Sequence, residues 1–188
     1  MIDLKKNNLK KIKLLLLDVD GILTSGKKIY SDNGNVIGKE YCDLDFTAIK
    51  IFKSLSIKVI FISGDQTCNK SMAKNRNVDF YYTRKGSINR DKLFFLKGIE
   101  KKYKIDRKNM AFLGDDIFDL ELGKNIGYFV VPNNSMQILK NKADYVLKNN
   151  SGNYLIKEFL DLYLKIKKIK KINIQKIYDL EKNEQQQY

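Results

Sequence analysis

The 188-residue sequence contains no histidine. This absence excludes Ser-His-Asp catalytic triads, phosphatases with a histidine nucleophile and zinc sites with histidine ligands. Carboxylates are therefore the side chains available as acids, bases and nucleophiles. Cysteine is also scarce, because only Cys42 and Cys68 occur and they form no CxxC motif. With no recognisable signal peptide, this usage predicts a reduced, cytoplasmic protein without a disulfide framework.

Arginine is rare in a strongly basic chain. The formal net charge is +14, but only four of the 36 basic residues are arginine. Because nucleic-acid interfaces rely heavily on arginine, this lysine-rich surface does not predict nucleic-acid binding, although it would attract an anionic substrate. The apolar run Leu14–Leu17 is too short to span a membrane, so we expect no membrane contact. The length predicts one domain with a core of its own.

What the sequence does contain is a repeated arrangement of acids after short apolar runs. Leu14–Leu17 is typical of a strand buried on both faces of a parallel sheet. Asp18 and Asp20 follow it on the same face of an extended chain, and Gly21 lets the backbone turn beneath them. Asp and Gly after a strand often form only a turn. The recurrence downstream favours a functional site.

The second acidic motif follows the apolar run 109–113. Gly114 is succeeded by Asp115, Asp116 and Asp119, and a helix at this point would put Asp115 and Asp119 one turn apart. Between the two motifs, an apolar run ends in the hydroxyl of Ser63. Two acidic strand ends of a parallel sheet can share one metal ion.

Strands alternate with helices along the rest of the chain. We expect further strands at 57–62, 78–82, 109–113, 127–131 and 144–146. We expect helices at 45–55, 66–75, 88–103, 135–140 with Ser135 as N-cap, and 153–171. This order predicts an α/β fold with three layers, a Rossmann-like doubly wound parallel sheet whose site lies at the carboxyl ends of the strands.

A β-hairpin interrupts this pattern at about residues 25–42, where Asn33-Gly34 separates two short strand-like runs. It is the only sizeable insertion after the first acidic motif. We expect residues 1–171 to form the domain and residues 172–188 to form a polar, frayed C-terminal tail.

The motif Asp18-Val19-Asp20-Gly21-Ile22-Leu23-Thr24, taken with Gly114-Asp115-Asp116, resembles the haloacid dehalogenase superfamily of phosphohydrolases. Within it, the sequence is most similar to the 3-deoxy-D-manno-octulosonate 8-phosphate phosphatases, from about residue 14 to about residue 164. The spacing leaves no room for a large cap domain. The resemblance implies a homotetramer in which hairpins assemble a central barrel and a neighbouring subunit closes the site. It also implies a role in surface-glycan or lipopolysaccharide biosynthesis.

The resemblance implies a role for each polar residue. Asp18 would attack phosphorus and become an aspartyl phosphate, and Asp20 would be the general acid and base. Mg²⁺ would be held by Asp18, the backbone carbonyl of Asp20 and Asp115. Ser63 would hydrogen-bond a phosphate oxygen.

A lysine is needed to offset the charge on Asp18 and the phosphoryl group. Lys92 matches the family's Asp-Lys-Leu at a helix start, whereas Lys85 is a nearby competitor and a surface role for Lys92 is a rival interpretation. Asp116 and Asp119 would orient the waters of the metal and Lys92 rather than bind the metal.

The eight-carbon substrate is placed in doubt by two departures from the family. Asp65 stands where these phosphatases usually carry an arginine, and the glycine-rich C-terminal segment is reduced to 150–154. Relatives acting on nine-carbon sugar acids tend to have an acid at the first position. We therefore expect a phosphorylated 2-keto-3-deoxy sugar acid of eight or nine carbons, with Asp65, Gly64 and Thr24 as specificity candidates.

Three rival classes have distinct features. A receiver domain carries its phosphoaccepting aspartate on a later strand, whereas Asp18 follows the first. A phosphomutase or phosphotransferase should exclude water with a lid. A non-catalytic basic binding protein would not need Asp20, Ser63, Lys92 and Asp115 together.

Overall fold

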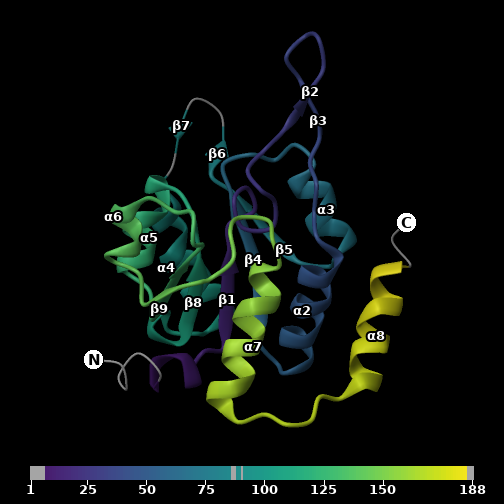
Figure 1. The fold of residues 1–188 in the computed structure, drawn as a ribbon, viewed down its shortest axis with the longest axis vertical. Coiled ribbons are helices and arrows are strands. Elements are labelled where there is room, and N and C mark those ends of the chain that lie inside the picture. Colours follow the sequence, from purple (N-terminus) through teal and green to yellow (C-terminus); the bar gives the residue numbers. More distant parts are fainter. Residues whose placement is uncertain (1–6, 86–87, 90, 186–188) are drawn as a thin grey trace.

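The computed structural model describes residues 7–85, 88–89 and 91–185 and has a single six-stranded parallel sheet at its centre (Figure 1). The strands lie in the order β10-β9-β8-β1-β4-β5. Their bounds are β1 Leu14–Leu17, β4 Lys58–Ser63, β5 Asp79–Tyr82, β8 Met110–Leu113, β9 Tyr128–Val131 and β10 Tyr145–Val146. From β1 the chain builds outward through β4 and β5, and then returns to build the other half from β8. The carboxyl ends of β1, β4 and β8 are therefore neighbours at the switch point, where doubly wound sheets bind ligands.

Helices cover both faces of the sheet (Figure 1). Their bounds are α2 Asp43–Ser54, α3 Asn69–Asn75, α4 Lys92–Tyr103, α5 Leu120–Lys124, α6 Gln137–Lys140, α7 Leu155–Lys167 and α8 Ile174–Gln185, with 3₁₀ helices η1 Arg107–Asn109 and η2 Ile117–Asp119. Leu15 and Leu17 of β1 belong to the same core cluster as residues of α2 and α7. Leu14 and Leu16 belong to a second cluster with residues of α4 and α5. Alternate leucines thus face opposite layers, which explains an uninterrupted apolar strand.

The predicted three-layer, doubly wound sheet without a large cap is confirmed, but some helix starts differ. The helix expected from residue 88 begins at Lys92, because the Asp91 carboxylate caps it by accepting from the Leu93 N–H at 3.1 Å. Ile88–Asn89 is instead a short strand, β7, paired with β6 at Arg84–Lys85. Residue 90 lies outside the described residues. The helix expected from residue 66 begins at Asn69.

Ser135 is not the N-cap that the sequence indicated. Helix α6 starts at Gln137 with Met136 as its N-cap, and the buried Ser135 hydroxyl has no hydrogen-bond partner among the described residues. At the other end of the chain, the helix expected at 153–171 spans only Leu155–Lys167.

The expected hairpin is present and projects from the body of the molecule (Figure 1). It consists of β2 Ile29–Tyr30 and β3 Val36–Gly38, which pair antiparallel across a turn in which Gly34 has φ 80°. Ile29, Tyr30 and Ile37 expose about 60% of their surface. The hairpin thus presents an apolar surface to solvent.

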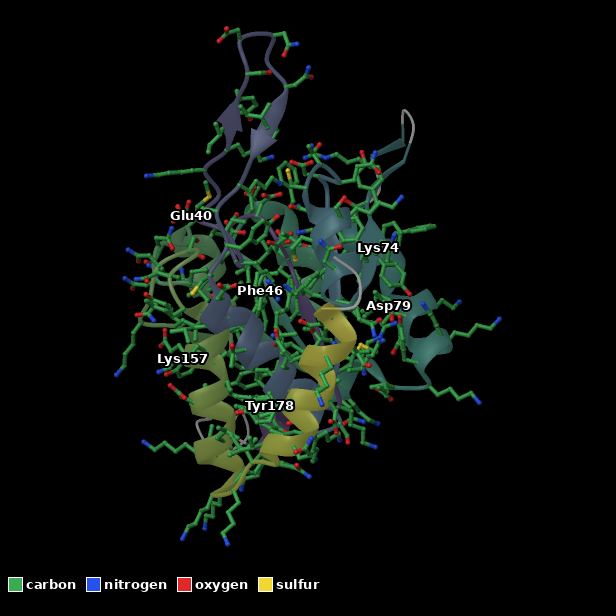
Figure 2. The ribbon with its side chains drawn as sticks, turned by 90° about the vertical axis from the view of Figure 1, so that its right-hand side faces the viewer. Glu40, Phe46, Lys74, Asp79, Lys157 and Tyr178 are labelled. Atoms are coloured by element: carbon green, nitrogen blue, oxygen red, sulfur yellow. The ribbon has the colours of Figure 1, made fainter. Side chains whose placement is uncertain are left out.

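The C-terminal segment differs from the frayed tail expected for residues 172–188. Residues Ile174–Gln185 form helix α8 beside α2 (Figure 2), while 186–188 lie outside the described residues. Glu184 is 1% exposed and faces Lys50, Lys53 and Arg76 at 3.4–3.5 Å. An ion-pair cluster rather than an apolar seam therefore holds this helix. The domain boundary at residue 171 stays a prediction.

Within the described residues, no helix combines the length and apolar character that crossing a membrane would require.

Candidate active site

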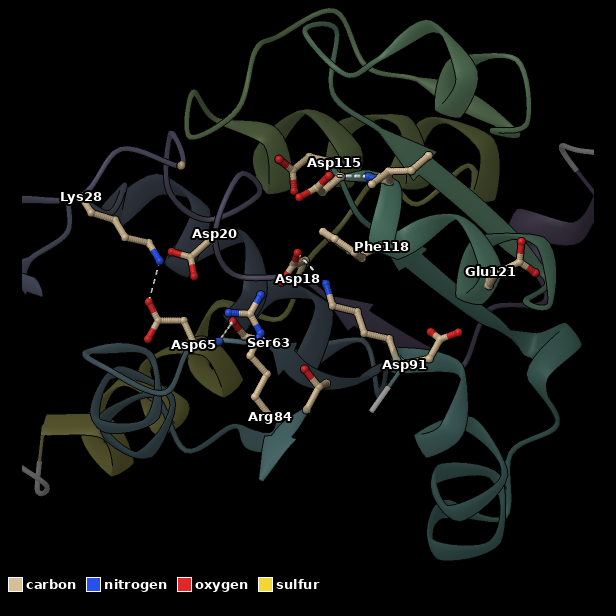
Figure 3. Close-up of a pocket in the computed structure, with 16 residues that line it drawn as sticks. Asp18, Asp20, Lys28, Ser63, Asp65, Arg84, Asp91, Asp115, Phe118 and Glu121 are labelled. Carbon is tan, nitrogen blue, oxygen red and sulfur yellow. Dashed lines mark hydrogen bonds and ion pairs between the residues drawn. The ribbon is translucent and has the colours of Figure 1, made fainter. Parts of the chain in front are cut away.

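A cavity of about 640 Å³ opens at the carboxyl ends of β1, β4 and β8 (Figure 3). We call the deep group formed by Asp18, Lys92, Asp115 and Asp119 the floor of this cavity. We call the group of Lys28, Lys39, Asp65 and Arg84 its rim. Ser63 and Asp20 lie between the two groups, and the remaining lining includes Asp91, Phe118 and Glu121.

Asp18 and Lys92 form the centre of the floor. Asp18 directly follows β1 and is 6% exposed, and its Oδ2 lies 2.6 Å from Lys92 Nζ. Burial raises the pKa of Asp18 to about 7, although the positive charge of Lys92 opposes this shift. For Lys92, burial alone would lower the pKa, but Asp18 and Asp119 outweigh burial and raise it. Lys92 is therefore a charged, buried lysine beside the expected nucleophile.

Asp119 holds the floor together. Its Oδ1 lies 2.5 Å from Lys92 Nζ, and its Oδ2 accepts from the backbone N–H groups of Asp115 and Asp116 at 2.9 and 3.1 Å. A Cβ at Gly114 would lie 2.6 Å from Asp119 Oδ2, so only glycine leaves room for this turn. Both oxygens of Asp119 are thus engaged by the protein.

The floor fits a divalent cation. Oxygen atoms of Asp18, Asp115 and Asp119 lie within 4.8 Å of one another, and Oδ1 of Asp115 is buried without a hydrogen-bond partner among the described residues. Burial, followed by the charges of Asp18 and Asp119, raises the pKa of Asp115 to about 8. Asp119 is fully buried, whereas Asp18 and Asp115 line the cavity, so these two are the carboxylates that could bind the metal, and hard oxygen donors suit Mg²⁺.

Gly21 allows Asp115 to approach the first motif. It has φ 84°, and a Cβ there would lie 1.9 Å from Asp115 Oδ2. The carboxylate of Asp115 therefore lies against the backbone that follows Asp20, as expected if the Asp20 carbonyl also binds the metal. The Asp20 carboxylate is not part of the acidic cluster.

Ser63 ends β4 and is 1% exposed. Its Oγ accepts from the Asp65 N–H at 3.1 Å and from the Asn69 amide at 3.2 Å. These two bonds occupy the acceptor capacity of the hydroxyl, which leaves its proton free to donate to a ligand.

Asp20 is held by two residues that the sequence did not single out. Its Oδ1 lies 2.7 Å from Lys39 Nζ, and its Oδ2 accepts from the Asn69 amide at 3.0 Å. The Lys39 side chain is fully buried. Lys39 is the residue that follows β3, so the base of the hairpin contacts Asp20 directly.

On the rim, the negative charge of Asp65 is balanced by two lysines. Asp65 Oδ2 is paired with Lys28 at 2.7 Å and with Lys39 at 3.0 Å (Figure 3 shows the first pair). Burial would raise the pKa of Asp65, but hydrogen bonds from these two lysines outweigh it and lower the pKa. Gly64, the next specificity candidate, lies against Arg84, because a Cβ at position 64 would be 2.9 Å from Arg84 Nε.

Two sequence candidates support loops: Thr24 is not among the residues that line the cavity, whereas Asp116 lines it and caps a turn. Thr24, expected among the specificity residues, is fully buried, and its hydroxyl accepts from the N–H of Gly26 at 3.2 Å within its own loop. Asp116 is exposed and caps η2 by accepting from the Ile117 N–H at 2.5 Å. Thr24 thus supports the loop, and Asp116 supports the turn that carries Asp119.

The residues missed by sequence reasoning differ in how they could have been found. Asn69 begins α3 six residues after Ser63, and a polar residue at a helix start beside a strand end is a usable signal. Lys28, Lys39 and Arg84 carried no such signal, because their positions depend on how two hairpins fold over the sheet. The side chain of Lys85, the competitor of Lys92, is not described.

Comparison with known proteins identifies the family. The haloacid dehalogenase-like hydrolase family matches residues 66–160, about half of the chain. The chain belongs to this family. The expectation that it is a phosphatase of the haloacid dehalogenase superfamily is confirmed.

Curated relatives of this haloacid dehalogenase-like hydrolase include 3-deoxy-D-manno-octulosonate 8-phosphate phosphatases. The Escherichia coli K12 protein is 28% identical over 153 residues, covering 81% of this chain and 79% of the relative. The Salmonella typhimurium protein is 28% identical over 155 residues with the same coverage.

Solved structures agree on the fold. The 3-deoxy-D-manno-octulosonate 8-phosphate phosphatase of Moraxella catarrhalis, in complex with magnesium, phosphate and the sugar acid, superposes with a TM-score of 0.78 at 28% identity, covering 87% of this chain and 92% of its own. A hydrolase from Legionella pneumophila superposes with a TM-score of 0.80 at 23% identity, covering 96% and 95%. At that identity the second likeness concerns the fold alone.

Proposed function

We propose that this chain is a Mg²⁺-dependent phosphatase that hydrolyses a phosphorylated 2-keto-3-deoxy sugar acid, with 3-deoxy-D-manno-octulosonate 8-phosphate as its substrate. The observation that carries the proposal is the pairing of buried Asp18 with Lys92 at 2.6 Å, beside the Asp115 oxygen that has no hydrogen-bond partner in the described part of the chain. This arrangement supplies a nucleophile, a fixed positive charge and a place for a cation in one cavity.

Asp18 acts as the nucleophile. One of its carboxylate oxygens attacks phosphorus, the bond from phosphorus to the sugar oxygen breaks, and an aspartyl phosphate forms on Asp18. Lys92 and the Ser63 hydroxyl stabilise charge on the phosphoryl oxygens during this step. Water then attacks phosphorus, the bond to Asp18 breaks, and inorganic phosphate leaves with Asp18 regenerated.

Asp20 moves the protons. It gives a proton to the departing sugar oxygen and later takes one from the attacking water, a role that typically contributes about 10²- to 10⁴-fold in rate. Lys39 and Asn69 hold its carboxylate between the two halves of the site.

Asp18, Asp115 and the Asp20 carbonyl would hold Mg²⁺, which when bound would offset the repulsion between carboxylate and phosphate. Asp119 fixes the loop that carries Asp115 through two backbone hydrogen bonds, and it orients Lys92. Asp116 caps the turn that carries Asp119 and so helps to position it.

The eight-carbon substrate is supported by the curated relatives named above and by the Moraxella structure, which contains the sugar acid. With this substrate the enzyme would act in lipopolysaccharide or surface-glycan biosynthesis. The alternative is the 9-phosphate of a nine-carbon sugar acid, of the KDN or N-acylneuraminate type. The observation that favours the alternative is an acid, Asp65, at the cavity rim.

Assembly and location are part of the proposal. The exposed apolar residues of the hairpin, Ile29, Tyr30 and Ile37, suit a homotetramer built around this insertion. Cys42 and Cys68 are both free, as suits a reduced cytoplasmic setting.

The test is phosphate release by wild type and Asp18→Asn with Mg²⁺ or EDTA, using eight- and nine-carbon sugar-acid phosphates. We expect Mg²⁺-dependent turnover of one substrate, reduced about 10⁴-fold or more in the variant. Asp161→Asn is the matched control, because Asp161 lies on α7 in an exposed ion pair with Lys157. If Asp18→Asn released phosphate as fast as wild type, Asp18 would not be the nucleophile. If wild type released no phosphate from either substrate, the protein would be a non-catalytic binding protein.

A further inference from the structure

Arg84 is an exposed residue that lines the cavity, and the backbone just before it is anchored. The N–H of the preceding residue, Thr83, donates to the Ser63 carbonyl at 3.0 Å, so the backbone here is tied to the end of β4. Thr83 is 4% exposed. From β6 the Arg84 side chain points into the cavity toward Ser63 (Figure 3), with its guanidinium against Gly64.

Arg84 forms no ion pair with any residue that the structure describes. Lys92 is paired with Asp18 and Asp119, and Lys28 is paired with Asp65. Among the described residues that line the cavity, Arg84 is the cation that forms no ion pair. A guanidinium that points into a cavity without a carboxylate partner is suited to bind an anionic group of a ligand.

The phosphoryl group already has its own partners on the floor. Lys92, the Ser63 hydroxyl and the metal site supply positive charge and hydrogen bonds there. An extra cation above them is suited to a second anionic group of the same substrate. We propose that Arg84 binds the carboxylate of the substrate and so makes the enzyme prefer acidic sugar phosphates. This inference rests on the proposed function.

The surroundings of Arg84 allow a carboxylate to approach. Asp65, the acid nearest in sequence to Gly64, would repel an anion if its charge were unbalanced. Its Oδ2 is instead paired with both Lys28 and Lys39 at 2.7 and 3.0 Å. The planar guanidinium can donate two parallel hydrogen bonds to a carboxylate, which lysine cannot do.

Direct binding is the main test, and it does not require turnover. In the Asp18→Asn background with Mg²⁺, isothermal titration calorimetry would measure Kd for a 2-keto-3-deoxy sugar-acid phosphate and for an aldose phosphate without a carboxylate. Adding Arg84→Gln should weaken binding of the acid about 10- to 100-fold and change binding of the aldose phosphate less than about threefold. The Arg84→Lys variant should bind the acid with an affinity between those of the protein with Arg84 and the Arg84→Gln variant, because lysine keeps the charge but cannot donate two parallel hydrogen bonds.

Three results would overturn the inference. Equal weakening of both ligands would place Arg84 on the phosphoryl group, and unchanged affinities would place its side chain outside the bound complex. If the sugar-acid phosphate did not bind more tightly than the aldose phosphate while Arg84 is intact, no carboxylate subsite would exist. The proposed function fails separately, when wild type does not hydrolyse either sugar-acid phosphate.

Steady-state kinetics provide a second readout in the otherwise wild-type protein. Arg84→Gln should raise KM for the sugar-acid phosphate about 10- to 100-fold while kcat stays within about threefold. Arg107→Gln is the matched control, because it removes the same charge from a half-buried pair with Glu100 that does not line the cavity. A fall in kcat with unchanged KM would instead make Arg84 part of the phosphoryl-transfer machinery and overturn the inference.

Discussion

The floor and the rim of the cavity both carry carboxylates, but their pKa values move in opposite directions. On the floor, burial raises the pKa of Asp18 to about 7 and that of Asp115 to about 8. On the rim, hydrogen bonds from Lys28 and Lys39 overcome burial and lower the pKa of Asp65. The floor acids are therefore short of positive charge, whereas the rim acid has two lysines.

This difference indicates that the floor residues perform the reaction, whereas the rim residues recognise the substrate. The floor residues come from the ends of β1 and β8 and from the start of α4, and both core clusters hold those elements in place. The rim residues come from the two hairpins and from the loop after β4. We infer that a cation completes the floor. The rim residues other than Lys39, which also holds Asp20, can change with the substrate without disturbing the catalytic centre.

Among the changes that compare the floor with the rim, the largest effect is expected from removing the positive charge of Lys92. Lys92→Met should lower kcat about 10²- to 10³-fold, because the charge beside Asp18 is lost and two acids are left without their partner. Kinetics with saturating substrate measure this, and thermal melting checks that the variant is folded. Lys97→Met, an exposed change on the same helix, should behave as wild type. A loss of less than about threefold in Lys92→Met would remove Lys92 from the phosphoryl site.

A smaller effect is expected from Lys39, which acts through Asp20 as a positioning residue. Lys39→Met should lower kcat about 10-fold with little change in KM, because Asp20 loses the contact at 2.7 Å that orients it. In an Asp20→Asn background the same change should have no further effect on kcat. Lys27→Met, at an exposed position near the hairpin, is the control. Additive losses would show that Lys39 acts independently of Asp20.

The floor was more predictable from sequence than the rim for a physical reason. A strand buried on both faces must be continuously apolar, as Leu14–Leu17 is, and the acids that follow it necessarily lie at the sheet edge. Asp18, Ser63 and Asp115 could therefore be placed from their spacing alone. Lys39 could not, because its burial depends on where the base of the hairpin meets the body of the molecule, and nothing in the sequence distinguishes it from other lysines.

Helix α8 was missed for a related reason. Its segment is polar, so apolar periodicity did not predict that it would pack. It is held by Glu184 inserted among Lys50, Lys53 and Arg76, which lie on α2 and after α3. Such an ion-pair cluster joins residues more than 100 positions apart. Local sequence patterns carry no information on contacts of this kind.

The smallest expected effect is a pH-dependent shift in thermal stability. Measuring this shift in floor and rim variants compares the two groups directly. Without metal, the native floor binds more protons than the unfolded chain at pH 6 to 8, because the pKa values of Asp18 and Asp115 are raised. Stability should therefore rise as pH falls from 8 to 6. Mg²⁺ needs the deprotonated carboxylates, so its stabilising effect should be larger at pH 8, with Tm raised by about 5 °C near 100 times Kd.

Two variants separate the contributions to this shift. Asp115→Asn should abolish the Mg²⁺ effect on Tm at both pH values, because it removes the carboxylate whose oxygen has no other partner among the described residues. Asp65→Asn should retain the effect, because its charge is already matched by Lys28 and Lys39 and does not depend on the metal. If both variants lost the Mg²⁺ shift equally, the metal would be bound across floor and rim together, and the division between them would be wrong.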